Sequence, residues 1–388
     1  MAVQAEDSQS LKPGRVLYVD NLRVVLTCLV MMHHLAITYG GPGRWYYNEL
    51  GPMSDISAIL MMLFLAINQS FFMGFFFMVS SYFTPASVER HGAGAYTRDR
   101  LKRLGIPLVF YILVISPLLN YVLALSRGFD GNIAEFLPLF VKSLTGLDVG
   151  PLWFVETLLF FSLLYVVWWL VFGSRSVRRE EGNSAPSNAA IALFGVALGL
   201  STFVLRIWLP VGWVFAPMGL QFPHFIQYIA LFIVGLIAYQ RGWFARLTDS
   251  QGKTWGRVVV GLIALFPVIV ILGGVLEGNL DAAMGGLHWQ SFAYSMWEQL
   301  MCVAMVVTLL VWFRRRFNTQ NRLGRAMSTS AYATYVIHAP VIVLLALGLS
   351  GIQMDMGLKF LLLAPVAVSL SFLVGYLIKR LPLARSIL

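Results

Sequence analysis

Two adjacent histidines lie deep inside the first long apolar run of the chain. The run RVLYVDNLRVVLTCLVMMHHLAITY covers residues 15–39, carries Asp20 and Arg23 near its start, and contains His33 and His34 in its second half. Hydrocarbon offers no water to solvate an ionisable group, so such a group inside a membrane usually serves a site or a helix contact. A neutral imidazole can also act as a general base.

Arg23 and His34 are eleven residues apart, which is three helical turns. They therefore share nearly one helix face and are about 16 Å apart along the axis. A snorkelling arginine and a hydrogen-bonded histidine would be an alternative explanation. For the pair on one face we favour a functional site. His33 points about 100° away on the helix and is predicted to be structural.

A second group of charges is the segment TRDRLKRLGIP, residues 97–107. Arg100 and Arg103 are three residues apart, hence neighbours on a helix, and could clamp phosphate oxygens together. Ordinary anchoring of basic residues at a membrane surface explains the spacing alone at least as well. Arg98 and Lys102 are interpreted as solvated charges.

Glu156 lies about one turn into another apolar run, GPLWFVETLLFF, residues 150–161. Its predicted depth is similar to that of His34, and a buried carboxyl needs a partner. An imidazole would suit it, although depth does not fix the rotation of a helix. Glu298 and His338 are also predicted inside the membrane, as a site or as helix-packing hydrogen bonds.

The histidines at predicted membrane edges, His224 and His288, are given no role. Cys28 and Cys302 both lie in apolar runs and are interpreted as core packing. Two such cysteines imply neither a disulfide framework nor a metal cluster.

The composition requires a membrane as the solvent. Hydrophobic residues make up 58% of the chain and charged residues 12%, and the mean hydropathy is +0.75. This is far from a soluble globular protein. The polar first fifteen residues lack the features of a secretory signal, so the first apolar run is expected to remain as a helix.

The fold class predicted from hydropathy is an all-α polytopic membrane protein with about ten transmembrane helices in a single domain, residues 1–388. The predicted spans are 21–39, 56–83, 104–125, 152–172, 189–208, 224–240, 257–276, 290–313, 328–349 and 357–378. The polar, charged segment 173–188 is predicted to be a flexible cytoplasmic loop.

The distribution of basic residues predicts the orientation. If the ten spans alternate, about 23 of the 28 lysines and arginines fall on one side. That side, with both termini and the polar N-terminal segment 1–15, is predicted to be cytoplasmic. The net charge of +10 follows from this asymmetry and gives no reason to expect nucleic acid as a partner.

Several chemistries are excluded by missing motifs. The chain contains no GxxxxGK[ST] loop, no HExxH helix and no G-x-S-x-G elbow. A proton-coupled transporter or flippase, with His34, Glu156 and Glu298 as a relay, is an alternative class. We find no internal repeat that would support two transporter halves.

Five ordered motifs together resemble the acyltransferase-3 family of integral membrane acyltransferases. They are the R-x10-H spacing of Arg23 and His34, FFFMVSSYF at 75–83, RLKRLGIP at 100–107, LWFVETLLF at 152–160 and SAYATYVIH at 330–338. One departure is Ser81, where many members have glycine. A second departure is that no C-terminal hydrolase-like domain, such as some relatives carry, follows in this sequence, so a stand-alone membrane enzyme is expected.

The resemblance implies transfer of an acetyl or succinyl group from cytoplasmic acyl-CoA to a hydroxyl of an extracytoplasmic glycan, with branches that succinylate periplasmic glucans nearest. His34 matches the family's essential histidine, as base or acyl carrier, and Arg23, Arg100 and Arg103 match its basic residues, which would hold the CoA phosphates. Apart from the resemblance, the similar depth of Glu156 makes it a candidate orienting partner for the second nitrogen of His34. The bacterial inner membrane, acyl-CoA as co-substrate, no resident cofactor and no metal are the corresponding expectations.

Overall fold

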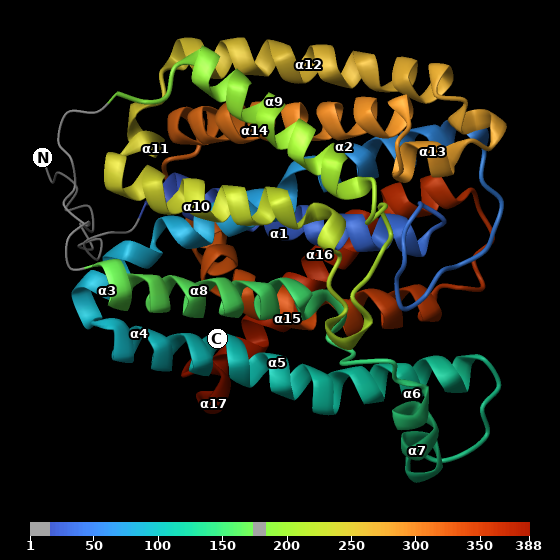
Figure 1. Cartoon of the computed structure of the whole chain (residues 1–388). Helices are drawn as coiled ribbons and strands as arrows, with labels where there is room; N and C mark the ends of the chain where they lie inside the picture. The colour runs from blue at the N-terminus through green and yellow to red at the C-terminus, as the bar shows by residue number, and fades with distance from the viewer. Residues whose placement is uncertain (1–15, 174–183) are drawn as a thin grey trace, which may run out of the picture.

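The structure of the chain is a computed structural model that describes residues 16–173 and 184–388 (Figure 1). Within these two ranges, ten helices are long and apolar enough to cross a membrane, which confirms the predicted number of spans. The predicted N-terminal segment 1–15 lies outside the described residues. So does most of the predicted loop 173–188, of which Gly173 and residues 184–188 are described.

The observed spans begin and end within a few residues of most predicted ones. The third and seventh spans start earlier than predicted. The ten spans are α1 (Leu17–Thr38), α2 (Asp55–Tyr82) continued by α3 (Thr84–His91), an interrupted helix from α4 (Ala93–Arg100) to α6 (Ser116–Ser126), α8 (Trp153–Phe172), α9 (Asn188–Arg206), α10 (Phe225–Arg241), α12 (Asp249–Leu272), α14 (Trp289–Arg316), α15 (Arg322–Gly348) and α16 (Met356–Arg380).

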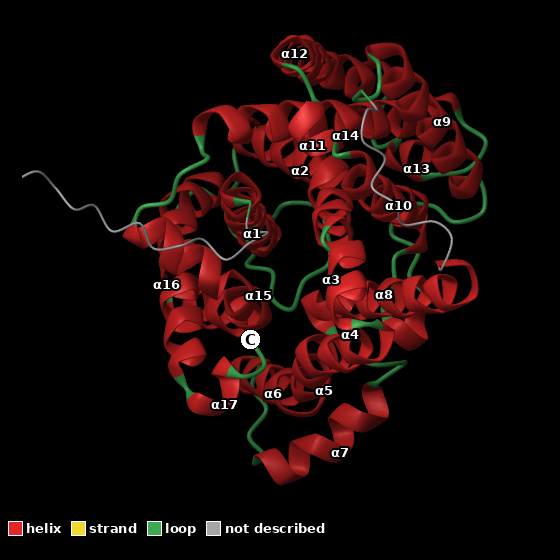
Figure 2. Ribbon diagram, turned by 90° about the vertical axis from the view of Figure 1, so that its left-hand side faces the viewer, coloured by secondary structure: helices red, strands yellow, loops and turns green. Residues whose placement is uncertain are grey.

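Short helices connect or extend these spans, and α7 stands off the bundle (Figures 1 and 2). They are α7 (Ile133–Ser143), η3 (Gly150–Leu152), η5 (Ala216–Met218), η6 (Phe222–His224), α11 (Trp243–Arg246), η7 (Val275–Glu277), α13 (Leu280–Met284) and α17 (Pro382–Arg385). The first helix, α1, lies inside the bundle and packs against α2, α14, α15 and α16. The two histidines are therefore on a central helix.

Proline shapes the third span. Two π-helical turns, η1 (Leu101–Gly105) and η2 (Tyr111–Ile115), flank α5 (Ile106–Phe110). Pro107 has no N–H to bond the carbonyl of Arg103, so that carbonyl is free for another donor. The Tyr332 hydroxyl of α15 donates to it at 2.7 Å. The irregular helix is thus tied to its neighbour at the position of the missing bond.

The described basic loops gather at one end of the bundle. That end carries the start of α1 together with α3, α4 and α11, whereas α6 and α13 lie toward the other end (Figure 1). The orientation of the two ends relative to the membrane is given by the prediction from the basic residues. On that prediction the first end is cytoplasmic.

Asp355 ties two spans together at the other end of the bundle. Its carboxylate accepts hydrogen bonds from the Ser54 N–H (2.7 Å), the Ser57 hydroxyl (2.6 Å) and the Leu358 N–H (3.0 Å). The bond from Ser57, and those from the two backbone N–H groups, hold its pKa below the usual range. The charged form is thus the one that caps α16 and joins it to α2.

We expect Asp355→Ala to unfold at a lower temperature than the wild type at pH 6–7. A depressed folded-state pKa contributes stability above the unfolded pKa of about 3.9, and that contribution is lost as the pH falls further. The difference in Tm should therefore shrink below about pH 4. Thermal unfolding of the detergent-purified proteins across this range measures it. A difference in Tm that stays constant with pH would contradict the conclusion that ionised Asp355 caps α16.

Candidate active site

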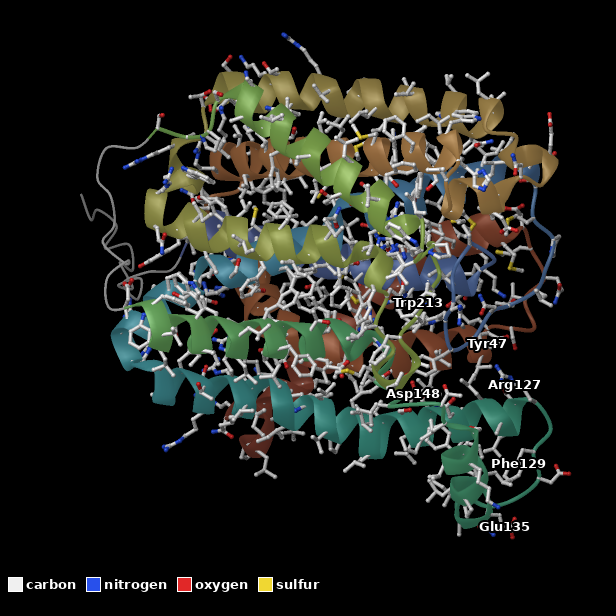
Figure 3. All side chains as sticks on the ribbon, viewed as in Figure 1. Tyr47, Arg127, Phe129, Glu135, Asp148 and Trp213 are labelled. Atoms are coloured by element: carbon white, nitrogen blue, oxygen red, sulfur yellow. The ribbon has the colours of Figure 1, made fainter. Side chains whose placement is uncertain are left out.

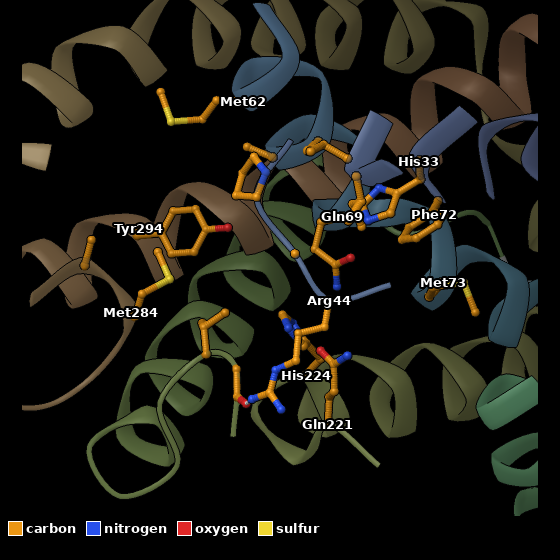
Figure 4. Close-up of a pocket in the computed structure, with 18 of the residues that line it drawn as sticks. His33, Arg44, Met62, Gln69, Phe72, Met73, Gln221, His224, Met284 and Tyr294 are labelled. Carbon is orange, nitrogen blue, oxygen red and sulfur yellow. Dashed lines mark hydrogen bonds between the residues drawn. The ribbon is translucent and has the colours of Figure 1, made fainter. Parts of the chain in front are cut away.

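A cavity of about 630 Å³, drawn in close-up in Figure 4, is lined in part by α13, which lies at the end of the bundle opposite the basic loops. Because His33, His34 and His224 line it, we call it the histidine cavity. Its wall also carries amides and phenols, from Gln69, Gln221, Gln290, Tyr228, Tyr294 and Tyr335. Of the described residues that line it, Arg44 alone is charged and none is a carboxylate. Such a wall offers hydrogen-bond donors and acceptors to a hydroxyl-rich ligand.

His34 contacts an indole and another imidazole. Trp45 stacks on it with ring centroids 3.8 Å apart and an interplanar angle of 12°. The His338 ring is nearly parallel at 19°, with its centroid 5.3 Å away. Nδ1 of His34 is buried and has no hydrogen-bond partner in the structure, although the residue is only partly buried. The nitrogen that can face the cavity is therefore Nε2.

His33 is fixed by different contacts. The amide nitrogen of Asn68 donates to the carbonyl of Leu29 at 3.1 Å and lies 3.2 Å from Nδ1 of His33. Since that nitrogen can only donate, Nδ1 of His33 accepts and the neutral ring carries its proton on Nε2. Phe72 stacks on the ring at 5.0 Å. These contacts suit the predicted structural role, yet the ring also lines the cavity.

The connection 39–54 between α1 and α2 places Trp45. Its Glu49 forms an ion pair of 2.5 Å with Lys359 of α16, and both side chains are buried. The Tyr46 hydroxyl donates to Asp148 at 3.3 Å. Burial and the Asp148 carboxylate raise the pKa of Tyr46, so the phenol stays protonated as the donor. Tyr47 and Asp148 lie at this end of the bundle (Figure 3). The ion pair with Lys359 and the hydrogen bond to Asp148 thus hold the loop in place.

Glu156 is buried in the first turn of α8, as its depth predicted, and its Oε2 has no hydrogen-bond partner. No hydrogen bond or ion pair of the described residues joins it to His34. Along α8 it lies between Trp153, which lines the histidine cavity, and Leu158, which lines a second cavity. The predicted orienting contact with His34 is therefore not formed in this structure.

The second cavity, of about 100 Å³, brings Arg23 and Arg100 together. We call it the arginine cavity; its wall includes Ser80 and Thr84. Arg23 lies over the Phe83 ring at 4.8 Å, and Nε of Arg100 is buried with no hydrogen-bond partner. Two guanidinium groups and two hydroxyls around so small a space suit an anionic oxygen group.

Arg103 does not line the arginine cavity. Its Nε donates to Asp99 at 2.7 Å, and 57% of its side chain is exposed. Arg100 lies 3.5 Å from the other oxygen of the same carboxylate. The π-helical turn that begins at Leu101 alters the spacing of an ordinary helix, so the two arginines do not form the predicted joint clamp around this space.

A buried ion pair lies behind the far wall of the histidine cavity. Nη2 of Arg206 is 2.6 Å from Glu298 and 3.2 Å from Nδ1 of His224. All three side chains are almost fully buried. The interpretation of His224 as a membrane-edge residue without a role is therefore wrong. The chain runs inward between α9 and α10, and η6 places His224 against the pair.

Sequence reasoning missed Trp45 and Arg206. Arg206 could have been found, because it is an ionisable residue near the end of a predicted apolar span. Trp45 lies in a loop with several aromatic residues and gives no such signal. In the ranges 16–173 and 184–388, no group of three His, Cys, Asp or Glu side chains is placed to hold a metal ion.

Comparison with known proteins gives a family and several relatives of the chain. The family described as "Acyltransferase domain" (acyltransferase-3) matches residues 16–380. Glucans biosynthesis protein C of Escherichia coli (strain SMS-3-5 / SECEC) is 24% identical over 84% of this chain and 82% of that protein. The protein of the same name from Shigella dysenteriae serotype 1 (strain Sd197) is 23% identical over the same shares. No solved structure matches the chain significantly. The chain, a multi-pass helical membrane protein with His34 at a largely apolar cavity that carries several polar groups, belongs to the acyltransferase-3 family of membrane acyltransferases.

Proposed function

We propose that this acyltransferase moves an acetyl or succinyl group from cytoplasmic acyl-CoA to a hydroxyl of a sugar or glycan on the other side of a bacterial inner membrane. Acyl-CoA would enter at the arginine cavity, and the acceptor would occupy the histidine cavity. The name of the bacterial relatives supports a glucan as the first acceptor to test.

The observation that carries the proposal is the position of the two cavities on shared helices. On α2, Met73 lines the histidine cavity and Ser80 lines the arginine cavity. Seven helical residues span about 10 Å, and Arg23 and His34 on α1 are about 16 Å apart. A CoA phosphate held by arginines would therefore be separated from the imidazole by a distance that its long pantetheine arm can cover.

The proposed chemistry needs one base. Neutral His34 takes the proton of the acceptor hydroxyl at Nε2, and the oxygen attacks the thioester carbonyl. The carbon–sulfur bond then breaks, and the CoA thiolate takes the proton back from the imidazolium. An ester and free CoA are the products. Arg23 and Arg100 bind the phosphates and do not touch the reacting atoms.

A covalent route through His34 uses the same residues. The imidazole would attack the thioester itself, release CoA, and pass the acyl group to the acceptor in a second step. Rapid mixing with acyl-CoA and no acceptor distinguishes the two routes. A burst of CoA release favours the covalent route, and its absence favours direct transfer.

Membership of an acyltransferase family favours group transfer over proton-coupled transport. Furthermore, among the described residues no hydrogen bond links His34 to Glu156 or Glu298 as a relay would require.

The test is transfer of labelled acetyl or succinyl from CoA to membrane carbohydrate, with membranes that carry the wild type or His34→Ala at matched expression. Label on a carbohydrate in the wild type alone supports the proposal and allows the acceptor to be isolated. If a panel of acyl-CoAs gives neither binding nor CoA release with the wild type, the proposal is wrong.

We expect Arg100→Gln to raise the KM for acyl-CoA by about 10- to 100-fold, because a charge-assisted hydrogen bond contributes roughly 1.5–3 kcal/mol. The kcat at saturating acyl-CoA should change little, since the arginine is remote from His34. Steady-state kinetics in detergent or nanodiscs measure both constants.

Arg98→Gln is the matched control for Arg100. Arg98 is two residues away and exposed, and it does not line the arginine cavity. It should keep the wild-type KM. Equal effects of the two substitutions would indicate a general loss of positive surface charge and would argue against a built phosphate site.

A further inference from the structure

The unpartnered nitrogen of His34 requires an explanation. Nδ1 is buried and accepts or donates no hydrogen bond in the structure. A buried polar atom without a partner costs free energy, so each such atom in a native protein needs an explanation. Trp45, which covers the ring face, cannot be an acceptor because its indole nitrogen only donates.

His338 of α15 has the complementary unpartnered atom. Its Nδ1 lies 2.6 Å from the carbonyl oxygen of Tyr335, which can only accept. Nδ1 of His338 therefore carries the proton, and in the neutral ring Nε2 holds a lone pair. That Nε2 is buried and also has no partner. The backbone thus fixes His338 as a hydrogen-bond acceptor.

The ring geometry places this acceptor beside His34. The Trp45 and His338 centroids are only 6.1 Å apart, much less than a linear stack through His34 would give. Trp45 covers the face of His34, so His338 lies beside its edge, and the two imidazoles are within 19° of parallel. Imidazoles joined by an N–H···N bond have centroids about 5 Å apart, since the two nitrogens are about 3 Å apart. The observed separation is 5.3 Å.

We infer that His338 is the positioning residue of His34: its Nε2 accepts the Nδ1–H of His34 and so leaves the lone pair of His34 on Nε2, toward the histidine cavity. A small rotation about the soft terminal torsion of the ring completes the bond. His338 does not line the cavity, so it acts through His34. The inference rests on the proposed function in that His34 is the reacting imidazole, and it replaces Glu156 as the orienting partner.

Two substitutions separate hydrogen bonding from packing. His338→Gln keeps an acceptor oxygen near the place of Nε2, whereas His338→Leu keeps the volume and removes the acceptor. We expect His338→Leu to lower kcat about tenfold with an unchanged KM for acyl-CoA. The kcat of His338→Gln should stay within about threefold of the wild-type value. Thermal unfolding of each variant identifies misfolded protein.

A second readout does not need the transfer reaction. Diethyl pyrocarbonate modifies an imidazole at its unprotonated nitrogen, and mass spectrometry of the peptide from α1 gives the rate. In a His33→Gln background that peptide has one histidine, His34. We expect His338→Leu to slow its modification several-fold. Tyr332→Phe, on the same helix and bonded to Arg103, is the control that should leave the rate unchanged.

The outcomes distinguish the inference from the proposed function. If His338→Leu matches the wild type in kcat and in the modification rate, the inference is wrong. The inference is also wrong if kcat falls as far in His338→Gln as in His338→Leu, because a loss of packing alone would then explain both results. If no acyl transfer is found with the wild type but the modification rates follow the expected order, the histidine pair stands and the proposed function fails.

Discussion

Replacement of His34 by alanine is expected to lower kcat for acyl transfer by about 10²- to 10⁴-fold, the usual contribution of a general acid–base residue. The KM for acyl-CoA should remain near the wild-type value, because the arginine cavity lies about 16 Å away along α1. Radiolabel transfer by purified protein in nanodiscs measures both constants. A variant that keeps more than about a tenth of the wild-type kcat would contradict a catalytic imidazole.

The neighbouring histidine provides the control for His34. His33→Asn keeps an acceptor oxygen near the place of Nδ1, for the Asn68 amide, and changes a side chain that lines the same cavity. We expect it to retain kcat within a few-fold of the wild type. If both substitutions were equally damaging, the assignment of His34 alone as the reacting imidazole would be wrong.

The second large effect is expected on stability. Arg206→Leu leaves the Glu298 carboxylate buried without its cation, which typically costs about 3–5 kcal/mol. Both side chains are fully buried, so solvent cannot replace the lost partner. We expect a clear fall in Tm and in the folded yield after detergent extraction. Fluorescence-detected gel filtration after a heating series measures both.

The double variant Arg206→Leu/Glu298→Met distinguishes a lost ion pair from a damaged helix contact. Replacing a buried pair by apolar side chains is often neutral, so the double variant should recover most of the stability lost by the single one. Ser295 and Gln299, which bond the pair at 3.4 and 3.1 Å, lose a partner and limit the recovery. If the double variant were instead destabilised by the sum of the two single losses in stability, the two charges would not stabilise each other.

The fold was predictable because long apolar runs identify membrane-spanning helices. Every run of about twenty apolar residues became a helix, and the structure has ten such helices. The third span shows where this reasoning fails. Its basic start reads as a surface loop, yet the helix begins at Ala93 and continues through two π-helical turns. Hydropathy detects apolar runs, and it does not detect polar helical turns that extend such a run.

The sequence named the candidate residues of the site, but it could not predict their contacts. Depth alone identified His34, Glu156, Glu298 and His338 as costly groups inside the membrane, and the structure places all four in helices that span it. The partner of His34 was not predictable, because depth does not fix helix rotation. The structure gives it the Trp45 and His338 rings, which come from a loop and from the ninth span.

The ion pair that fastens the loop over His34 also sets the order in which the protein becomes competent during biosynthesis. Glu49 and Lys359 are 310 residues apart, so the ribosome must complete nearly the whole chain before they meet. Until the tenth span has inserted, Trp45 lacks this support. An unfinished or truncated chain therefore contains His34 without its finished pocket. Such a chain is expected to show no acyl transfer, because His34 lacks the loop that carries Trp45 in its final position.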